Sequence, residues 1–180
     1  MRIDVSSSFL AVVDIQDRLV PAIAGGREAV GRAILLACAA RRLGVPMIAA
    51  EQYPQGLGPT VPELADILDT GPIVSKISFS AMGSPEFRKR VERLERPQAV
   101  ICGMEAHICA LQTALDLKAA GYDAFLVRDA CGSRKAVDAE TAFLRAAGCG
   151  IHVVTAEMVV YEWLERAGTP AFKDILNWVK

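Results

Sequence analysis

The sequence predicts an α/β protein built on a doubly wound, Rossmann-like sheet of six parallel strands in the order 3-2-1-4-5-6, with helices on both faces. Three observations support this fold class. Six short apolar runs recur along the chain, segments of helical periodicity alternate with them, and the connections are short. Strands that are apolar throughout are typical of parallel sheets, because helices cover both faces. Residues 1–180 carry no repeat, linker or low-complexity tract, so we expect a single domain.

The apolar runs place the strands. We expect them at residues 8–15, 45–50, 72–75, 99–102, 122–128 and 151–155. The first run, SFLAVVDI, ends with Asp14, and Lys76 directly follows the third run. An acid that ends a buried strand either reaches into a site or caps a helix, and a lysine in that position is usually solvated.

The periodic segments place the helices. We expect them at residues 21–44, 61–68, 85–94, 133–147, 156–167 and 170–179, with a further helix that begins near Cys109. Gly44 ends the first helix, and Ser84, Ser133 and Thr155 are expected N-caps. The tail at residues 170–179 docks either on a partner subunit or on its own domain.

The segment 51–59, EQYPQGLGP, is too rich in glycine and proline to form regular structure. It leaves the edge of the sheet at which α/β proteins bind ligands. It is therefore either an ordinary crossover loop or one wall of a pocket.

Composition excludes several classes of function. The net charge is −1 and no basic run is present, which argues against nucleic acid or an anionic membrane as a partner. The sequence has no apolar run of the length of a membrane span and no signal-peptide pattern at its start. The five cysteines are odd in number and lack CxxC spacing, so we expect a cytoplasmic protein. The hydrophobic share of 52% indicates a doubly covered sheet or a homo-oligomer, a dimer or larger.

Cys109 lies in the stretch around which the chain is organised, QAVICGMEAHICALQTAL at residues 98–115. A strand is expected to turn at Gly103 and lead into a helix whose first turn holds the thiol. A helix N-terminus favours negative charge, so this position predicts a lowered pKa for Cys109 and a nucleophilic role. The alternative is that Cys109 is a small buried hydrophobe.

Asp14, Lys76 and Cys109 all follow strands, so in a parallel sheet they share one edge. With the expected strand order, Asp14 and Cys109 flank the crevice where the winding reverses, and Lys76 is long enough to reach it. A carboxylate can accept the thiol proton, an ammonium can hold both charges, and a thiolate can attack an electrophilic carbon.

The segments VVDIQDRL, SKISFS, ICGMEAHICALQTALDL and VRDACGSR resemble the isochorismatase-like cysteine hydrolases over residues 5–165, and most closely the isochorismatase domain-containing proteins. The resemblance implies a catalytic triad of Asp14, Lys76 and Cys109. It also implies a cis peptide bond between Met104 and Glu105, and an oxyanion hole made by the backbone N–H groups of Glu105 and Cys109.

Relatives that act as nicotinamidases hold a divalent metal with an Asp and two His after the second strand. This sequence has only two histidines, His107 and His152, and neither lies there, so Glu51 stands alone. We therefore expect no metal and no cofactor. His107 is expected to be a partly exposed residue at the helix start rather than a catalytic group.

The sequence thus predicts a metal-independent cysteine hydrolase that cleaves a small amide, or a related C–N or C–O bond, through a covalent thioester. Cys109 attacks, Asp14 is the general base and Lys76 tunes the charge. Gln16, Tyr53, Phe79 and Glu105 are the expected substrate-binding residues. One alternative is a catalytically silent, oligomeric binding or scaffold protein that retains the fold. Another is a thiol redox protein, for which Cys131 is the only plausible second thiol.

Overall fold

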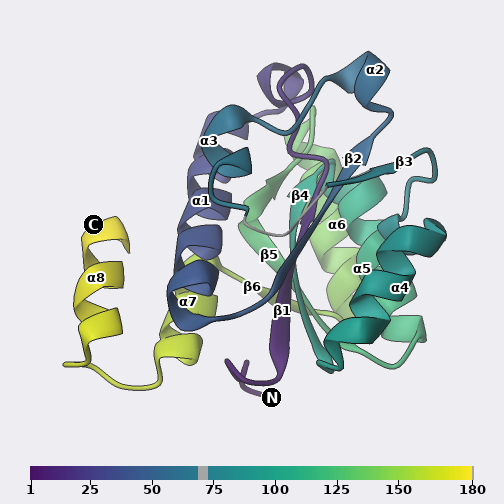
Figure 1. The fold of residues 1–180 in the computed structure, drawn as a ribbon. Helices are drawn as coiled ribbons and strands as arrows, with labels where there is room; N and C mark the ends of the chain where they lie inside the picture. Colours follow the sequence, from purple (N-terminus) through teal and green to yellow (C-terminus); the bar gives the residue numbers. More distant parts are fainter. Residues whose placement is uncertain (69–72, 180) are drawn as a thin grey trace.

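A computed structural model describes residues 1–68 and 73–179. Its centre is a six-stranded, all-parallel sheet in the order β3-β2-β1-β4-β5-β6 (Figure 1). The strands are β1 (Ser8–Val13), β2 (Met47–Gln52), β3 (Val74–Lys76), β4 (Gln98–Met104), β5 (Asp123–Gly132) and β6 (His152–Val154). The predicted fold class and strand order are confirmed.

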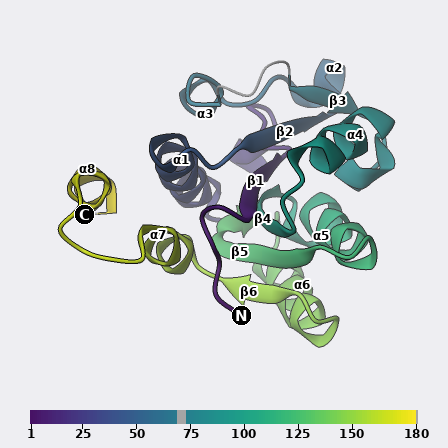
Figure 2. The same ribbon diagram turned by 60° about the horizontal axis from the view of Figure 1, so that its bottom comes forward.

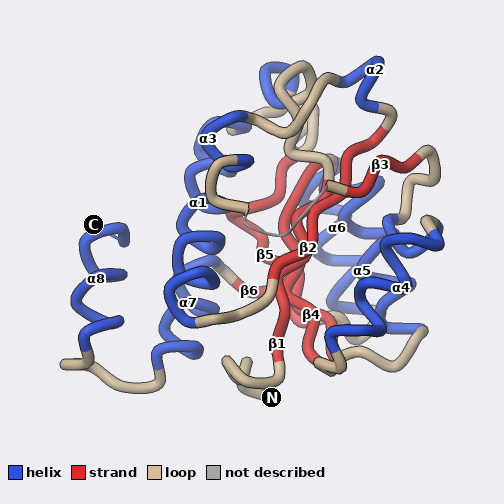
Figure 3. The backbone as a smooth tube through the Cα atoms, in the orientation of Figure 1, coloured by secondary structure: helices blue, strands red, loops and turns tan. Residues whose placement is uncertain are grey.

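Helices cover both faces of the sheet (Figures 1 and 2). The α-helices are α1 (Gly26–Leu43), α2 (Pro54–Leu57), α3 (Pro62–Ala65), α4 (Pro85–Leu94), α5 (Leu111–Ala119), α6 (Ala136–Gly148), α7 (Ala156–Leu164) and α8 (Pro170–Val179). Helices α1, α3, α7 and α8 lie on one face, and α4, α5 and α6 lie on the other. A π-helix, Ala106–Ala110, connects β4 to α5. Helical segments separate the strands along the chain (Figure 3). No helix in the described part of the chain is both long enough and apolar enough to cross a membrane.

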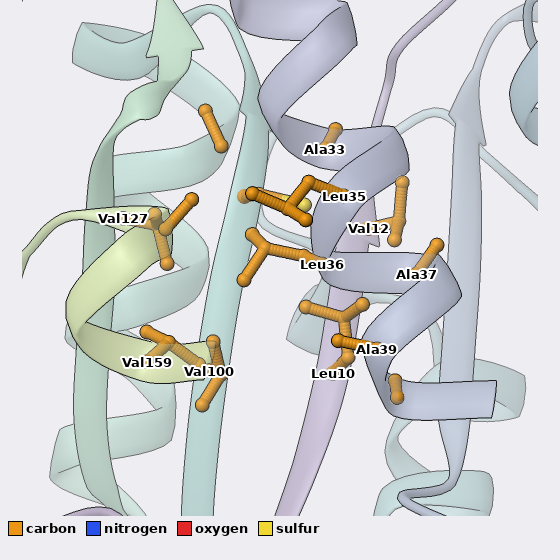
Figure 4. Packing of buried hydrophobic residues seen from close by; sticks show 14 of the residues in the cluster. Leu10, Val12, Ala33, Leu35, Leu36, Ala37, Ala39, Val100, Val127 and Val159 are labelled. Atoms are coloured by element: carbon orange, nitrogen blue, oxygen red, sulfur yellow. The ribbon is translucent and has the colours of Figure 1, made fainter. Parts of the chain in front are cut away.

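Alternate residues of the central strands supply the two cores. In β1, Leu10 and Val12 pack toward α1 and α7, whereas Phe9 and Ala11 pack toward α4 and α5. Leu36 of α1 lies over the sheet between the side chains of β1 and β4 (Figure 4). Every residue of β1 is buried, and all of them except Ser8 are apolar, as the sequence predicted.

Strands β1 and β4 are neighbours at the point where the winding reverses, with Val13 opposite Gly103. Gly103 has φ 147°, and a Cβ atom there would clash with the carbonyl oxygen of Val13. Only glycine fits this close approach. The predicted turn at Gly103 is wrong, since β4 continues to Met104 and the chain turns after it.

Several predicted boundaries also need correction. The first long helix begins at Gly26 rather than 21, because Val20–Ala22 forms a separate 3₁₀ turn. Strand β5 runs on to Gly132, through a register shift against β4, although the strand was expected to end at residue 128. The loop at 51–59 contains one regular turn, α2. Strand β3 begins at Val74, and residue 72 of the expected strand lies outside the described residues.

The predicted helix caps are confirmed at two of three positions. The side chains of Ser84 and Thr155 accept hydrogen bonds from the backbone N–H groups of Phe87 and Met158. Ser133 is not a cap, because α6 starts three residues later, after Lys135.

Helix α8 packs on its own domain. Ile175 is fully buried in the core beside α1, and the carboxylate of Asp174 pairs with Nε of Arg42 at 2.8 Å. The tail was expected to dock either on a partner subunit or on its own domain, and in the structure it docks on its own domain.

Candidate active site

Asp14, Lys76 and Cys109 meet at the C-terminal edge of the sheet. Asp14 directly follows β1, Lys76 is the last residue of β3, and Cys109 lies in the π-helix after β4. π-Helical turns are rare and are often found at functional sites. The parallel topology brings the three residues together, because the ends of all six strands face the same way.

Lys76 and Asp14 form a buried ion pair. Nζ of Lys76 lies 2.7 Å from Oδ2 of Asp14, and neither side chain is exposed. The ammonium also donates to Oε1 of Gln52 at 2.7 Å and to the carbonyl oxygens of Ser78 and Phe79 at 3.2 and 3.0 Å. Because these acceptors surround the charge, Lys76 is held in a single position.

The other carboxylate oxygen of Asp14, Oδ1, is buried and has no hydrogen-bond partner among the described residues. The backbone of Asp14 is left-handed, with φ 56°, and its N–H group donates to the carbonyl of Ala50 at 3.0 Å. Burial raises the pKa of Asp14 to about 6, against the opposing effect of the Lys76 charge. Asp14 is therefore mostly ionised at neutral pH and retains an oxygen that can accept a proton.

Cys109 is 6% exposed. Burial, and then the negative charge of Asp14, raise the pKa of its thiol to about 12. The lowered pKa predicted from the helix position is wrong, because the loss of water around a thiolate and the nearby carboxylate outweigh the Lys76 charge. The thiol is therefore protonated at rest, beside a group that can act as its base.

Thr113 fixes the turn that holds the thiol. Its hydroxyl donates to the carbonyl of Cys109 at 2.7 Å and accepts from the backbone N–H of Ala81 at 2.9 Å. Thr113 is fully buried, so it joins the helix of the thiol to the segment that follows β3.

A cavity of about 240 Å³ opens onto Asp14 and Cys109. The other lining residues are Leu19, Gln52, Leu57, Phe79, Met104, Glu105, Ile108 and Arg134. Phe79 and Glu105 were among the predicted substrate-binding residues. Gln52 and Arg134 were missed, although Gln52 ends an apolar strand and Arg134 ends the segment VRDACGSR that carried the resemblance.

Two predicted substrate-binding residues do not line this cavity. The side-chain amide of Gln16 is buried and bonds to backbone atoms of Gln52 and Gly58, which ties down the loop after β2. Tyr53 lies in that loop and is 56% exposed.

Glu105 follows a cis peptide bond that joins it to Met104. Its carboxylate accepts from the backbone N–H of Arg134 at 2.9 Å and from Nε of Arg134 at 3.0 and 3.2 Å. Its carbonyl accepts from the N–H groups of Ile108 and Ala110. Both ends of the residue are thus held, which orients the backbone between β4 and the thiol.

Glu51 and His107 bond to other protein groups. Oε1 of Glu51 accepts from the N–H and hydroxyl groups of Thr60 at 2.6 and 2.7 Å. Nδ1 of His107 lies 2.8 Å from the hydroxyl of Ser133, and the imidazole is partly exposed, as predicted. Within residues 1–68 and 73–179, no group of three or more His, Cys, Asp or Glu side chains could hold a metal ion.

All five cysteines are free. Cys131 is buried in β5 opposite Gly103. The redox alternative therefore gains no support from a disulfide among the described residues.

Comparison with known proteins identifies the family of the chain. The model of the isochorismatase domain matches residues 8–158. Isochorismatase domain-containing protein 2A of Mus musculus is 39% identical over 180 residues, which cover 99% of this chain and 85% of the mouse protein. The MAR1 ribonuclease of Caenorhabditis elegans superposes with a TM-score of 0.93 at 33% identity, covering 99% of this chain and 92% of that one.

YcaC from Pseudomonas aeruginosa, solved with hexane-2,5-diol and covalent acrylamide, also superposes with a TM-score of 0.93. It is 25% identical and covers 98% of this chain and 91% of its own. The family match spans most of the chain, and the mouse relative extends it to nearly every residue. The chain therefore belongs to the isochorismatase-like hydrolase family.

Proposed function

We propose that this protein is a cysteine hydrolase that cleaves a small amide through a thioester on Cys109. One observation carries the proposal. The buried carboxylate of Asp14 has one oxygen 2.7 Å from the Lys76 ammonium, its other oxygen is unpartnered among the described residues, and Asp14 and Cys109 line the same cavity. A nucleophile beside an oriented base is the arrangement that covalent catalysis needs.

In the acylation step, Asp14 takes the thiol proton while Sγ of Cys109 attacks the amide carbon. The S–C bond forms as the carbonyl π electrons move to oxygen, and the backbone N–H groups of Glu105 and Cys109 stabilise the oxyanion. The oxyanion then collapses, the C–N bond breaks, and the nitrogen leaves with the proton from Asp14. Lys76 balances the charge on Asp14 when the carboxylate is ionised and the charge on sulfur when it is not.

In the deacylation step, Asp14 removes a proton from water, and the resulting hydroxide attacks the thioester carbon. The C–S bond breaks, and sulfur regains the proton from Asp14. The products are a carboxylic acid and ammonia or an amine, and the enzyme returns to its initial state. Asp14 thus acts as base and acid in turn.

The relatives bear on this proposal in two ways. YcaC was solved with covalent acrylamide, so a protein of this fold can form a covalent bond to a small molecule. The name of the Caenorhabditis elegans relative points instead to RNA. RNA phosphates are bound by clustered Lys and Arg side chains, whereas this sequence has no basic run and a net charge of −1. We therefore place a small amide ahead of RNA.

The test is ammonia release from a panel of small primary amides, with and without EDTA, by the wild-type protein and by Cys109→Ala. We expect turnover that EDTA leaves unchanged and that Cys109→Ala abolishes, with an acyl mass increment on Cys109 after acid quenching. Amides that bind without ammonia release or acyl-enzyme would overturn the proposal in favour of a silent binding protein. Turnover of RNA that survives Cys109→Ala would overturn it in favour of a nuclease.

A further inference from the structure

The cavity beside Cys109 has an apolar wall. Five of its lining side chains are hydrophobic: Leu19, Leu57, Phe79, Met104 and Ile108. A volume of about 240 Å³ accommodates a ligand of roughly eight non-hydrogen atoms at about 30 Å³ each. The wall favours an aliphatic acyl group of that size.

Each cation at the cavity already has an anionic partner. Arg134 lines the cavity, and its Nε and backbone N–H groups both bond to the carboxylate of Glu105. Lys76, behind the cavity wall, is paired with Asp14. Glu105 is 8% exposed at its side chain and Arg134 is 61% exposed, so the anion is the buried member of the outer pair.

The charges at the cavity therefore cancel, with Asp14 and Glu105 opposite Lys76 and Arg134. Transfer of the thiol proton from Cys109 to Asp14 moves a negative charge to sulfur but leaves this balance unchanged. A carboxylate on a substrate would meet Glu105 and Asp14 without an unpaired cation to compensate, and like charges at such short range repel strongly in a partly buried site.

We propose that the cavity selects small, uncharged aliphatic amides, and that Glu105 sets this selectivity by neutralising Arg134. The inference rests on the proposed function for its substrate class. The selectivity itself concerns any reagent that reaches Cys109, and it is measurable without turnover. Glu105→Gln keeps the shape of the side chain but leaves Arg134 uncompensated, so it should admit anions. Arg134→Gln leaves the Glu105 carboxylate uncompensated, so it should exclude them more strongly.

The experiment compares alkylation of Cys109 by iodoacetamide, which is neutral, and by iodoacetate, which is anionic and of nearly the same size. In both reactions the sulfur–carbon bond forms as iodide leaves. Cys149 is exposed in the same chain, so its rate ratio for the two reagents corrects for their intrinsic reactivity. The variants are Glu105→Gln and Arg134→Gln, read by peptide mass spectrometry.

For the wild type we expect the corrected ratio to favour iodoacetamide by about 10-fold or more. Glu105→Gln should bring the ratio to about one or below, and Arg134→Gln should increase it. Because both variants break the same ion pair, a purely structural role would shift the ratio in the same direction for both. A wild-type ratio near one, or shifts in the same direction, would overturn the inference.

A matched substrate pair separates this inference from the proposed function. 4-Methylpentanamide and succinamate have the same number of non-hydrogen atoms, with an isopropyl group in place of a carboxylate. Hydrolysis of both at equal kcat/KM would refute the selectivity while supporting the hydrolase. Hydrolysis of neither, with the alkylation ratios as expected, would refute the hydrolase while supporting the selectivity.

Discussion

Nζ of Lys76 lies 2.7 Å from Oδ2 of Asp14, and both side chains are completely buried. Removal of two charges from water is unfavourable, so such a pair holds together only because each charge compensates the other. The pair joins the ends of β1 and β3, two strands that do not pair with each other in the sheet. Its disruption should therefore affect the stability of the protein and the ionisation of Asp14 together.

Lys76→Met should lower the free energy of unfolding at pH 8 by about 3–5 kcal/mol, because it leaves the Asp14 carboxylate buried and uncompensated. The pKa of Asp14, already raised to about 6, should rise further without the ammonium. A pKa above the unfolded value means that the folded protein binds the proton more tightly. The contribution of Asp14 to stability is therefore fully present below its unfolded pKa and is lost as the pH rises through its folded pKa.

Urea denaturation at pH 5 and pH 8 measures this effect. The loss of stability caused by Lys76→Met should be clearly smaller at pH 5, where Asp14 is protonated. Lys89→Met, at an exposed position on α4, is the matched control and should change little at either pH. An equal loss at both pH values would show that the ammonium does not compensate a charged Asp14.

Thr113→Val should lower the free energy of unfolding by about 1–3 kcal/mol. It removes the acceptor of the buried Ala81 N–H group and the hydrogen bond to the Cys109 carbonyl. It should also slow the alkylation of Cys109, since the turn that holds the thiol loses its link to the segment after β3. Thr113→Ser keeps the hydroxyl and should retain most of both properties.

Thr141→Val is the control for that prediction. The Thr141 hydroxyl makes the same bond to the carbonyl four residues earlier, 2.7 Å from Val137, but on the exposed side of α6. We expect a change within about 0.5 kcal/mol. A loss as large as that of Thr113→Val would mean that the local helix bond, rather than the buried link, explains the effect.

Gly103→Ala should lower the free energy of unfolding by about 3 kcal/mol or more, because the added Cβ meets the backbone of Val13 and φ 147° is strained for alanine. Gly31→Ala offers a contrast, since it lies within α1 with nothing within 4 Å of the new Cβ. That change should stabilise the protein by up to about 1 kcal/mol. Equal tolerance of the two substitutions, measured by urea denaturation, would contradict the close approach of β1 and β4.

The sequence was sufficient for the architecture, since fully buried strands such as β1 leave an apolar run that few other structures explain. It also located Asp14, Lys76 and Cys109, because the residues that follow parallel strands share one edge. Local pattern could not foresee the continuation of β5 to Gly132, which depends on its register against β4.

Three-dimensional surroundings decided the rest of the site. The thiol pKa of Cys109 depends on burial and on Asp14, which lies 95 residues away in the chain, so helix position alone gave the wrong sign. Arg134 lines the cavity and forms an ion pair with Glu105. This contact joins residues far apart in the chain, so the sequence around either residue does not reveal it. The homo-oligomer and the cytoplasmic location stay predictions.

The most direct test of the account is the pH dependence of Cys109 alkylation by iodoacetamide, in the wild type and in Asp14→Asn. If Asp14 is the base, the wild-type rate should rise to a plateau above pH about 6, the pKa of Asp14. At pH 7, Asp14→Asn should react about 100-fold more slowly and gain about tenfold per pH unit, as a thiol without a base does. Buried Cys102 should stay unmodified in both proteins, which reports an intact fold. A wild-type rate that climbs steadily with pH and is unchanged in Asp14→Asn would contradict the account.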